Sequence, residues 1–551
     1  IPGYPFVYWI SDRIRELFGK YKPLEKFAKV AHGLSTGNND QFLRFWWEVR
    51  QEDISVDYKI DRKKWLPYAK GGPYNKWYGN LWWVVSWEDG NEMRKLSGSR
   101  LDNIPYYFKE GLTYSFVSSF GFSCRYMPKN CIFDVGGSSM FPISGSPQEF
   151  SGIITSKLIS FVMRILNPTV NYQVGDLKNI PTAHPSALGS KSISPDEVRD
   201  LLGSLASHSP LSTLNSVTLS SLAQDCIELK KELYCFHVME RDFKHDPLTW
   251  GLKELREEGR PVRVKDALKR FFIHKAELEA RLLINEAVND ELVFKLYGLL
   301  PEDLTLTDII TRSGLLTGRT QYGSSDPYAP VLEVLESEGV PAGAYPAREL
   351  TAKEREKLRD LYLKHRHDRG SGKSEAITGM EFGIVEELAN ALKASPVTVV
   401  EELAKIDGLP PEAVKDVLSE HIQALAIEIM REDNDGILSL STDTAETSLP
   451  TRIVKKWREL GIGDTYDELE NLLGKKLEEY LLKDFFKDHS KRFMGRPIIW
   501  HLVSDRGSVN FLVLHHIWSY DRMLLLRSKY LGDVNRTLEN TLATETDERK
   551  R

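Results

Sequence analysis

The start of the chain concentrates aromatic side chains between glycine-rich turns. Eight of the twelve tryptophans lie before residue 90, and residues 31–49 run from a Gly/Asn turn directly into a cationic aromatic block, AHGLSTGNNDQFLRFWWEV. Two interpretations of this block are open. Trp46 and Trp47 can seed a hydrophobic core, since aromatic side chains bury large areas. Alternatively, Arg44 and its aromatic neighbours can form a surface that contacts a polyanion.

The next block continues the same pattern. Lysines alternate with tryptophan and tyrosine over residues 61–87, DRKKWLPYAKGGPYNKWYGNLWWVVSW. Such alternation combines phosphate neutralisation with stacking surface. The sequence Gly71-Gly72-Pro73 predicts a turn at which the backbone can approach a ligand closely. The block therefore favours an anion-facing surface over an isolated core motif.

Charge is distributed unevenly along the chain. Residues 1–185 contain 23 Lys and Arg against 17 Asp and Glu, whereas the remaining residues contain 50 against 62, within a formal net charge of −6. A basic N-terminal module on an acidic body is the expected arrangement.

Length and composition indicate an ordinary globular chain. With 551 residues, 41% of them hydrophobic and 28% charged, about three or four domains are expected. There is no apolar run of eighteen residues and no secretory signal at the first residues, so a cytoplasmic location is expected. Cys124, Cys131, Cys226 and Cys235 have no CxxC spacing, which argues against a disulfide framework and a zinc site. A chain that begins at Ile1 rather than methionine is expected to be a piece of a longer polypeptide.

The pattern of apolar runs and turn residues predicts a mixed α/β module followed by helices. Short strands are expected at 81–87, 113–119 and 131–135, and an apolar stripe predicts one helix over Ser151–Leu166 that ends at Asn167-Pro168. Residues 186–218, rich in Ser, Leu and Pro, are expected to form a flexible junction or partly ordered spacer. Residues 219–258 and 264–297 have the pattern of long amphipathic helices, and most of the remaining chain is also expected to be helical.

Several motif-like segments do not satisfy the requirements of the motifs. The GSGKS sequence at 370–374 lacks the first Walker glycine and is interpreted as a linker. Residues 398–418 have helix-turn-helix spacing, but acidic side chains on the second helix favour a plain helical hairpin. Residues 433–436 are too short for an EF-hand loop and predict a turn. His515 and His516 lie in an apolar run, where hydrogen-bonded core histidines are favoured over metal ligands or acids.

No catalytic motif is present. The sequence lacks a GxGxxG after a strand, HExxH, GxSxG and an Asn-Pro-Pro-aromatic motif, from which residues 167–169 depart. No catalytic, cofactor-binding or metal-binding residue is therefore assigned, and the residues favour a binding function.

Two parts of the sequence resemble one family. The first consists of GLSTGNNDQFLRFWWEV, KWLPYAKGGPYNKWYGNLWWVVSWEDG, YYFKEGLTYSFVSS, FSCRYMPKNCIFDVGG and NPTVNYQVGDLKNIP. These segments resemble the target-recognition region of PglX-type adenine-specific DNA methyltransferases of BREX phage-defence systems, to which type IIG restriction–modification enzymes are related. The block EEYLLKDFFKDHSKRFMGRPIIWHLVSDRGSVNFLVLHH resembles their C-terminal region. The likeness extends from about Pro5 to Tyr530 and is weakest at 300–480. The exit VGDLKNIP is also similar to the end of a recognition domain in type I specificity subunits.

The resemblance implies an α+β fold in four parts. These are the end of an upstream catalytic region or linker (1–30), a mixed α/β target-recognition domain (31–185), a helical spacer (186–345) and a mostly helical C-terminal domain (346–551). It also implies that the intact polypeptide binds S-adenosylmethionine in an upstream domain and transfers a methyl group to N6 of a flipped adenine. This chain would read double-stranded DNA for that domain and for other phage-defence proteins, without a cofactor or membrane of its own.

Seven polar residues are the candidate DNA contacts in this interpretation. Arg44, Lys70, Lys76 and Arg125 are candidates for phosphate or guanine, and Asn75, Asn80 and Gln173 for adenine edges. Replacing Lys76 or Arg44 with alanine is expected to weaken duplex binding, whereas replacing Trp82 is expected to destabilise the fold.

Two other classes of function remain. One is a stand-alone specificity subunit that docks on a separate methyltransferase, and the other is a helical protein-interaction scaffold. A scaffold predicts weak DNA binding with little salt dependence, whereas phosphate contacts predict a steep log–log salt slope.

Overall fold

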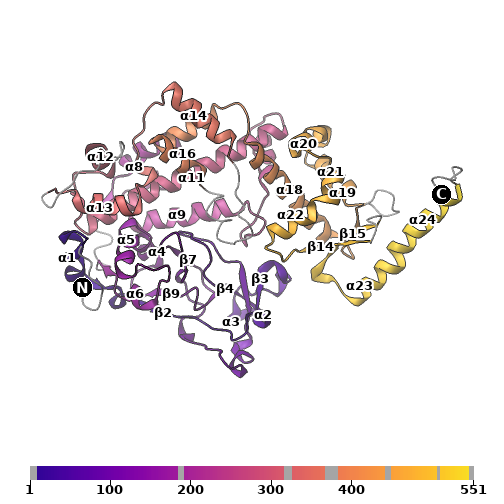
Figure 1. Cartoon of the computed structure of the whole chain (residues 1–551), viewed down its shortest axis with the longest axis horizontal. Coiled ribbons are helices and arrows are strands. Elements are labelled where there is room, and N and C mark those ends of the chain that lie inside the picture. Colours follow the sequence, from indigo (N-terminus) through magenta and orange to yellow (C-terminus); the bar gives the residue numbers. More distant parts are fainter. Residues whose placement is uncertain are drawn as a thin grey trace.

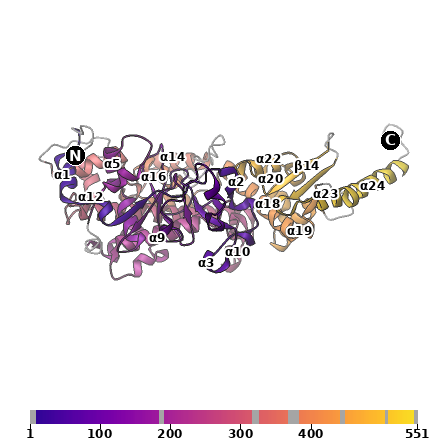
Figure 2. The ribbon, with the colours of Figure 1, turned by 90° about the horizontal axis from the view of Figure 1, so that it is seen from below.

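The computed structural model of the chain describes residues 9–183, 191–314, 326–365, 383–440, 448–504 and 509–544. An N-terminal module of small sheets lies against a helical body, and a further helical part with its own sheet continues away from them (Figure 1). The C-terminal helix α24 extends outward in both views (Figures 1 and 2). The expected α+β class is confirmed.

The N-terminal module is built on two sheets. One has the strand order β2-β9-β6-β7 with antiparallel pairing, and the other has the order β3-β5-β4-β8, in which β4 and β8 are parallel. The first comprises β2 (Ala28–Ala31), β9 (Ser139–Pro142), β6 (Gly111–Tyr114) and β7 (Cys124–Met127). The second comprises β3 (Leu43–Phe45), β5 (Trp83–Ser86), β4 (Trp65–Ala69) and β8 (Ile132–Phe133). Two of the expected strands are present but shorter than predicted, as β5 and β8, whereas the strand expected at 113–119 is β6, which begins earlier and ends at Tyr114. A separate two-stranded pair is formed by β1 (Lys22–Pro23) and β10 (Pro181–Thr182). The helices of the module are α1 (Asp12–Lys20), α2 (Asn39–Phe42), α3 (Tyr58–Asp61), α4 (Pro147–Ile154), α5 (Lys157–Leu166) and α6 (Val174–Lys178).

The single helix expected over Ser151–Leu166 is wrong, because the chain forms α4 and α5 there. Ser156 separates them: its Oγ donates to the carbonyl of Ile153 at 2.7 Å and accepts the N–H of Ile159 at 3.3 Å. One hydroxyl therefore closes the first helix and caps the second, as serine does at helix N-termini. The apolar stripe continues across the break, which is why periodicity alone did not reveal it.

The segment 219–258 also forms two helices instead of one. Pro247 occupies the first turn of the second helix, and Asp246 caps it by accepting the N–H of Thr249 at 3.0 Å. The segment expected to be a flexible junction or a partly ordered spacer has regular structure over 191–218, where β11 (Ser192–Ile193) pairs with β12 (Val217–Thr218) around α8. The helices of this body are α8 (Pro195–Leu202), α9 (Leu219–Tyr234), α10 (Pro247–Glu257), α11 (Val264–Leu296), α12 (Leu306–Ser313), α13 (Ala329–Glu338), α14 (Ala352–Leu363), α16 (Ile384–Leu392) and α17 (Pro396–Ala404).

Helix α11 is the central helix of the body, against which several other helices pack. It spans 33 residues, as expected for 264–297, and packs against α9, α10, α16 and α17. Figure 1 shows α9 and α11 running along one side of the N-terminal module, with α9 next to α4.

The C-terminal part packs around α18, the second helix of the expected hairpin. Its sheet has the order β13-β15-β14. The elements are α18 (Pro411–Glu432), α19 (Leu449–Glu459), α20 (Tyr466–Leu473), α21 (Leu477–Lys483), α22 (Phe485–Arg492), α23 (Tyr520–Leu525), α24 (Leu531–Thr544), β13 (Ile437–Ser439), β14 (Ile499–Val503) and β15 (Asn510–Leu514). The GSGKS segment lies outside the described residues.

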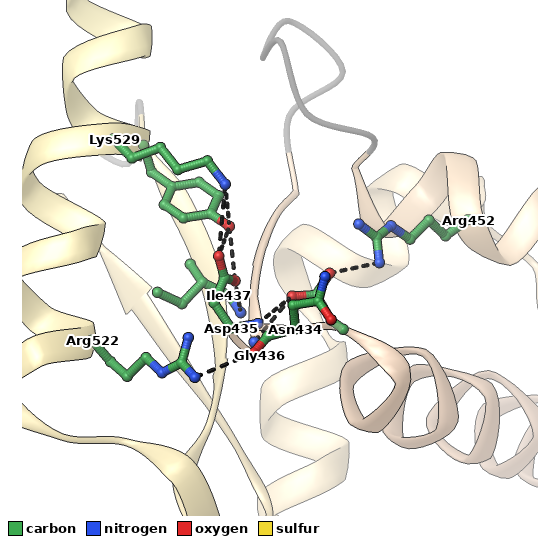
Figure 3. Close-up of polar contacts among 9 residues, drawn as sticks. Asn434, Asp435, Gly436, Ile437, Arg452, Arg522 and Lys529 are labelled. Atoms are coloured by element: carbon green, nitrogen blue, oxygen red, sulfur yellow. Dashed lines mark hydrogen bonds and ion pairs between the residues drawn. The ribbon is translucent and has the colours of Figure 1, made fainter.

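The turn that follows α18 is confirmed and joins three elements (Figure 3). Asp433 accepts two backbone N–H groups of the turn through Oδ1 and the Arg452 guanidinium of α19 through Oδ2 at 2.7 Å. Tyr530 donates its hydroxyl to Asp435 at 2.8 Å, and Arg522 of α23 donates to a backbone carbonyl of the turn at 3.2 Å. Asp433 therefore links the turn to α19, and Asp435 links it to Tyr530, which directly precedes α24.

Aromatic donors attach the N-terminal module to the body. Three of them reach the segment between α9 and α10: the Trp46 indole donates to the Met239 carbonyl at 2.7 Å, that of Trp82 to Glu240 at 2.8 Å, and the Tyr78 hydroxyl to Asp242 at 2.5 Å. For Trp46, whose indole contacts Met239, the interpretation as a packing residue is therefore correct.

Trp47 attaches the module to the C-terminal part. Its indole is fully buried and donates to the Arg496 carbonyl at 3.1 Å, and its own carbonyl accepts a hydrogen bond from His516 Nε2 at 2.7 Å. His515 donates to the carbonyl of Glu48 at 3.2 Å. Both histidines are half-buried and hydrogen-bonded, as expected.

Candidate nucleic-acid interface

Two glycine loops cross at the ends of β4 and β8. A Cβ atom at Gly137 would lie 2.4 Å from the Ala69 carbonyl oxygen, and one at Gly71 would lie 2.5 Å from the Gly136 carbonyl oxygen. Gly71 and Gly72 have φ values of 77° and 124°, which side chains disfavour. The predicted Gly71-Gly72 turn is therefore present, and its glycines are required by the crossing of two backbones.

Backbone hydrogen bonds extend this crossing into a continuous surface. The Gly136 carbonyl accepts the N–H of Phe116 at 3.0 Å, and the Phe116 carbonyl accepts the N–H of Tyr172 at 2.7 Å. The N–H of Ser118 then donates to the Val170 carbonyl at 3.0 Å. We call residues 70–72, 116–121, 135–137 and 169–173 together the loop ridge. Three of its loops connect strands of the two sheets, and the fourth, 169–173, connects α5 to α6. Loops on a rigid scaffold are typical of binding surfaces.

Two predicted contacts, Lys70 and Gln173, lie on the loop ridge. The Lys70 ammonium lies 5.1 Å from the ring centre of Trp83, and burial lowers the pKa of Lys70 while the nearby Asp134 raises it. Gln173 is exposed at the start of α6. Asp134 holds the glycine loop by accepting the N–H of Gly136 at 2.5 Å and the hydroxyl of Tyr68 at 2.7 Å.

The loop ridge also presents apolar side chains that sequence reasoning missed. Phe120 is 70% exposed, Val117 is 51% exposed and Val170 is 48% exposed. Protruding apolar side chains on a recognition surface can wedge between base steps. The sequence signal was the run SFVSSFGFS, in which aromatic residues stand in a Ser/Gly loop after a strand.

Arg44 lies on the same sheet as Lys70. It belongs to β3, which pairs with β5, and its side chain is half-buried. Its guanidinium Nη1 donates to the backbone carbonyls of Asp40 and Leu43, each at 2.6 Å. These bonds fix the side chain at the sheet edge and leave other donors of the guanidinium for a ligand.

The two asparagines predicted to read adenine lie inside the protein. Asn75 and Asn80 are 4% and 2% exposed. Asn75 Nδ2 donates to the Tyr234 hydroxyl at 2.6 Å and to the Tyr78 carbonyl at 3.0 Å, while Asn80 Nδ2 donates to the Pro73 carbonyl at 2.8 Å. These amides fold the turn and dock it on α9, so the structure does not place them on the ridge surface.

Lys76 also faces the interior. Its ammonium lies 3.7 Å from a Glu286 carboxylate oxygen, and Glu286 also accepts the Trp77 indole N–H at 2.6 Å. Burial alone would lower the pKa of Lys76, but Glu286, assisted by Tyr74 and Asp290, raises it above its ordinary value. Lys76 therefore joins the module to α11 through a charged pair.

Arg125 is fully buried. Its Nη1 donates to Ser115 Oγ at 3.2 Å, and Ser115 Oγ donates to the Gly72 carbonyl at 2.8 Å. Nε and Nη2 have no hydrogen-bond partner among the residues that the structure describes, and burial lowers the pKa of Arg125 to about 10. Arg125 thus supports the Gly72 turn from beneath and is not on the surface.

Other kinds of site are not found in the described parts of the chain. Within them, no group of three histidine, cysteine, aspartate or glutamate side chains could hold a metal ion, and no helix has the length and apolarity needed to cross a bilayer. Cys124, Cys131, Cys226 and Cys235 are buried thiols without disulfide bonds.

Comparison with known proteins gives two relatives. The chain is 36% identical over 198 residues to the adenine-specific methyltransferase PglX of Lacticaseibacillus casei (strain Zhang) and 37% identical over 201 residues to the adenine-specific methyltransferase BrxX of Escherichia coli O9:H4 (strain HS). The matched part of this chain is PglX-like. It covers 33% and 35% of the chain, and only 16% of the length of each relative. No protein-family model matches the chain.

The PglX-like segment therefore connects this chain to proteins named as adenine-specific methyltransferases. It does so over a third of the chain, whereas the resemblance noted in the sequence extends over most of it.

Proposed function

We propose that this chain is the DNA-recognition part of a PglX-like adenine-N6 methyltransferase that acts in bacterial phage defence. The observation that supports this most directly is the loop ridge: a lysine, an exposed glutamine and exposed apolar side chains lie on loops that backbone hydrogen bonds link to one another. A basic N-terminal module in a PglX-like chain fits a phosphate-rich ligand. In the whole protein, a separate catalytic domain would bind S-adenosylmethionine, and no residue of this chain is assigned to that cofactor.

Each kind of side chain on the loop ridge has its own task in this proposal. Lys70 on the ridge and Arg44 on the edge strand β3 neutralise backbone phosphates, and Gln173 hydrogen-bonds a base edge. Phe120 and Val117 wedge against the base stack, which lowers the free energy needed to extrude a target base. Asn75, Asn80, Lys76 and Arg125 keep the turn in place behind this surface.

Replacing Lys70 with alanine is expected to weaken duplex binding about three- to tenfold at physiological salt and to reduce the log–log salt slope by about 0.9, because one phosphate contact is lost. Replacing Phe120 with alanine is expected to lower affinity without changing that slope. Fluorescence anisotropy with a labelled duplex at several salt concentrations measures both quantities. Lys253→Ala on α10, where the side chain is 59% exposed, is the matched control. Equal affinities for all variants would remove the ridge from the proposal.

Selection from a random duplex pool tests recognition itself. After several rounds at physiological salt, an enriched asymmetric motif that contains adenine is expected. If the chain retains duplex DNA without enriching a motif, it binds only the phosphate backbone. If it retains no DNA, the scaffold alternative is favoured.

A further inference from the structure

A cleft distinct from the loop ridge lies where three parts of the chain meet. It has a volume of about 410 Å³ and is lined by Gln51 and residues 54–56 and 128–131 of the N-terminal module, the segment between α9 and α10, and the end of α18. A larger cleft of about 620 Å³ adjoins it through shared walls at Trp46, Phe243 and Arg431. Volumes of this size suit small-molecule ligands.

Three basic side chains face this cleft: Lys129, Arg241 and Arg431. In the described part of the chain, neither Arg241 nor Arg431 has a hydrogen bond or ion pair from its guanidinium to the protein. Desolvation lowers the pKa of Arg431, and no carboxylate acts to raise it. Arg431 and Arg50 both lower the pKa of the neighbouring His516, after the larger effects of burial and His515. Arg431 and Arg50 therefore add positive charge near the cleft, which is also lined by the carboxyl groups of Glu240 and Asp242, while the adjoining cleft includes Glu428, Glu432 and Glu459.

The two carboxyl groups that line the cleft each accept a hydrogen bond from the N-terminal module. Glu240 accepts the Trp82 indole N–H at 2.8 Å, and Asp242 accepts the Tyr78 hydroxyl at 2.5 Å. These bonds hold the two acidic side chains against the N-terminal module. The arginines, which come from separate elements, converge on the cleft without such partners.

The remaining walls are aromatic or apolar. Trp46 and Phe243 are half-buried and stand beside the arginines, and Ile54 and Pro67 form the buried floor. An aromatic wall next to two guanidinium groups combines a stacking surface for a planar ring with bidentate donors for phosphate.

We propose that this cleft binds a nucleotide unit, with its phosphate on Arg241 and Arg431 and its ring against Trp46 or Phe243. The unit can be a free mononucleotide or a nucleotide within a DNA strand, since both present the same chemistry. Binding would bridge the N-terminal module, the body and the C-terminal part. This inference does not rest on the loop ridge.

Isothermal titration calorimetry of the whole chain with dAMP and with deoxyadenosine tests the phosphate requirement. Wild-type protein is expected to bind dAMP at least about tenfold more tightly than deoxyadenosine. The double variant Arg241→Gln/Arg431→Gln is expected to lose this difference. Arg359→Gln on α14, an exposed arginine outside the cleft, is the matched control and is expected to behave as wild type.

A labelled 20-base-pair duplex distinguishes the two sources. If dAMP binds and the double variant keeps duplex affinity, the ligand is a free nucleotide. If dAMP does not bind but the double variant loses duplex affinity at least about fivefold, the nucleotide belongs to DNA. Unchanged duplex affinity together with no dAMP binding would overturn the proposal. If the double variant fails to fold, the variant Arg241→Lys/Arg431→Lys replaces it. The comparison of dAMP with deoxyadenosine on wild-type protein then tests the phosphate requirement independently. The Lys70→Ala variant in the same assay separates failure of the ridge from failure of the cleft.

Discussion

Replacing Trp82 with alanine is expected to lower the free energy of unfolding by about 3–5 kcal/mol, measured by urea-induced unfolding, because a large buried side chain leaves a cavity. Trp82 is 4% exposed and packs in the core that joins the N-terminal module to α10 and α18. Its indole N–H also donates to Glu240, which is 6% exposed, so the alanine variant additionally leaves that carboxylate without this donor.

Two further variants separate the contributions. Trp82→Phe keeps most of the buried area and removes the indole donor, so a smaller loss is expected. Trp9→Ala is the exposed control, because that side chain is 55% exposed, and a loss below about 1 kcal/mol is expected. A loss of the same small size for Trp82→Ala would show that the joint between module and body does not depend on this core.

The buried state of such residues could be predicted from the sequence only in part. Alternating aromatic and basic residues indicated both a core and a binding surface, and the structure contains both: Trp47 is buried, whereas Lys70 lies on the ridge. The partners that decide between them are remote in the chain. Trp47 meets Arg496 and His516, and local periodicity carries no information on contacts across more than four hundred residues.

Partners that are remote in the sequence also explain why some candidate DNA contacts lie inside the protein. Asn75 and Lys76 have the composition of a polar turn, and polar turns are usually on the surface. Here the turn is covered by α9 and α11, which supply Tyr234 and Glu286. By contrast, α11 could be predicted almost to its ends, because its apolar pattern is long, uninterrupted and local. The break at Ser156 depended on one hydroxyl, which hydrophobic periodicity does not record.

Glu279 on α11 is expected to make stability depend on pH. It is 3% exposed, its Oε2 accepts the N–H of Val385 at 3.2 Å, and its Oε1 has no hydrogen-bond partner among the described residues. Burial raises the pKa of Glu279 to about 7, although Lys275 at 4.0 Å and the Val385 N–H act in the opposite direction. The folded protein therefore holds this carboxyl in its neutral form near pH 6, where the unfolded chain is ionised.

The sign of the effect follows from the raised pKa. The stability that the neutral carboxyl contributes is fully present below the unfolded pKa of about 4.5 and is lost as the pH rises through about 7, with a total of up to about 3 kcal/mol. Glu279→Gln keeps the acceptor for Val385 and cannot ionise. Relative to wild type, this variant is expected to gain stability between pH 5 and pH 8. Urea-induced unfolding at several pH values measures this difference in the free energy of unfolding. The contributions of other titrating groups cancel in the difference, because both proteins contain them.

Glu257→Gln on α10 is the matched control for the pH series. That carboxylate is 62% exposed and forms an ion pair with Lys253 at 3.6 Å, so its replacement is expected to change stability by less than about 0.5 kcal/mol at any pH in this range. A difference between Glu279→Gln and wild type that stays constant from pH 5 to pH 8 would mean that Glu279 is ionised throughout. In that case Lys275 would have to stabilise the charge, and Lys275→Met would then destabilise the protein strongly, because a buried carboxylate would lose its counter-ion.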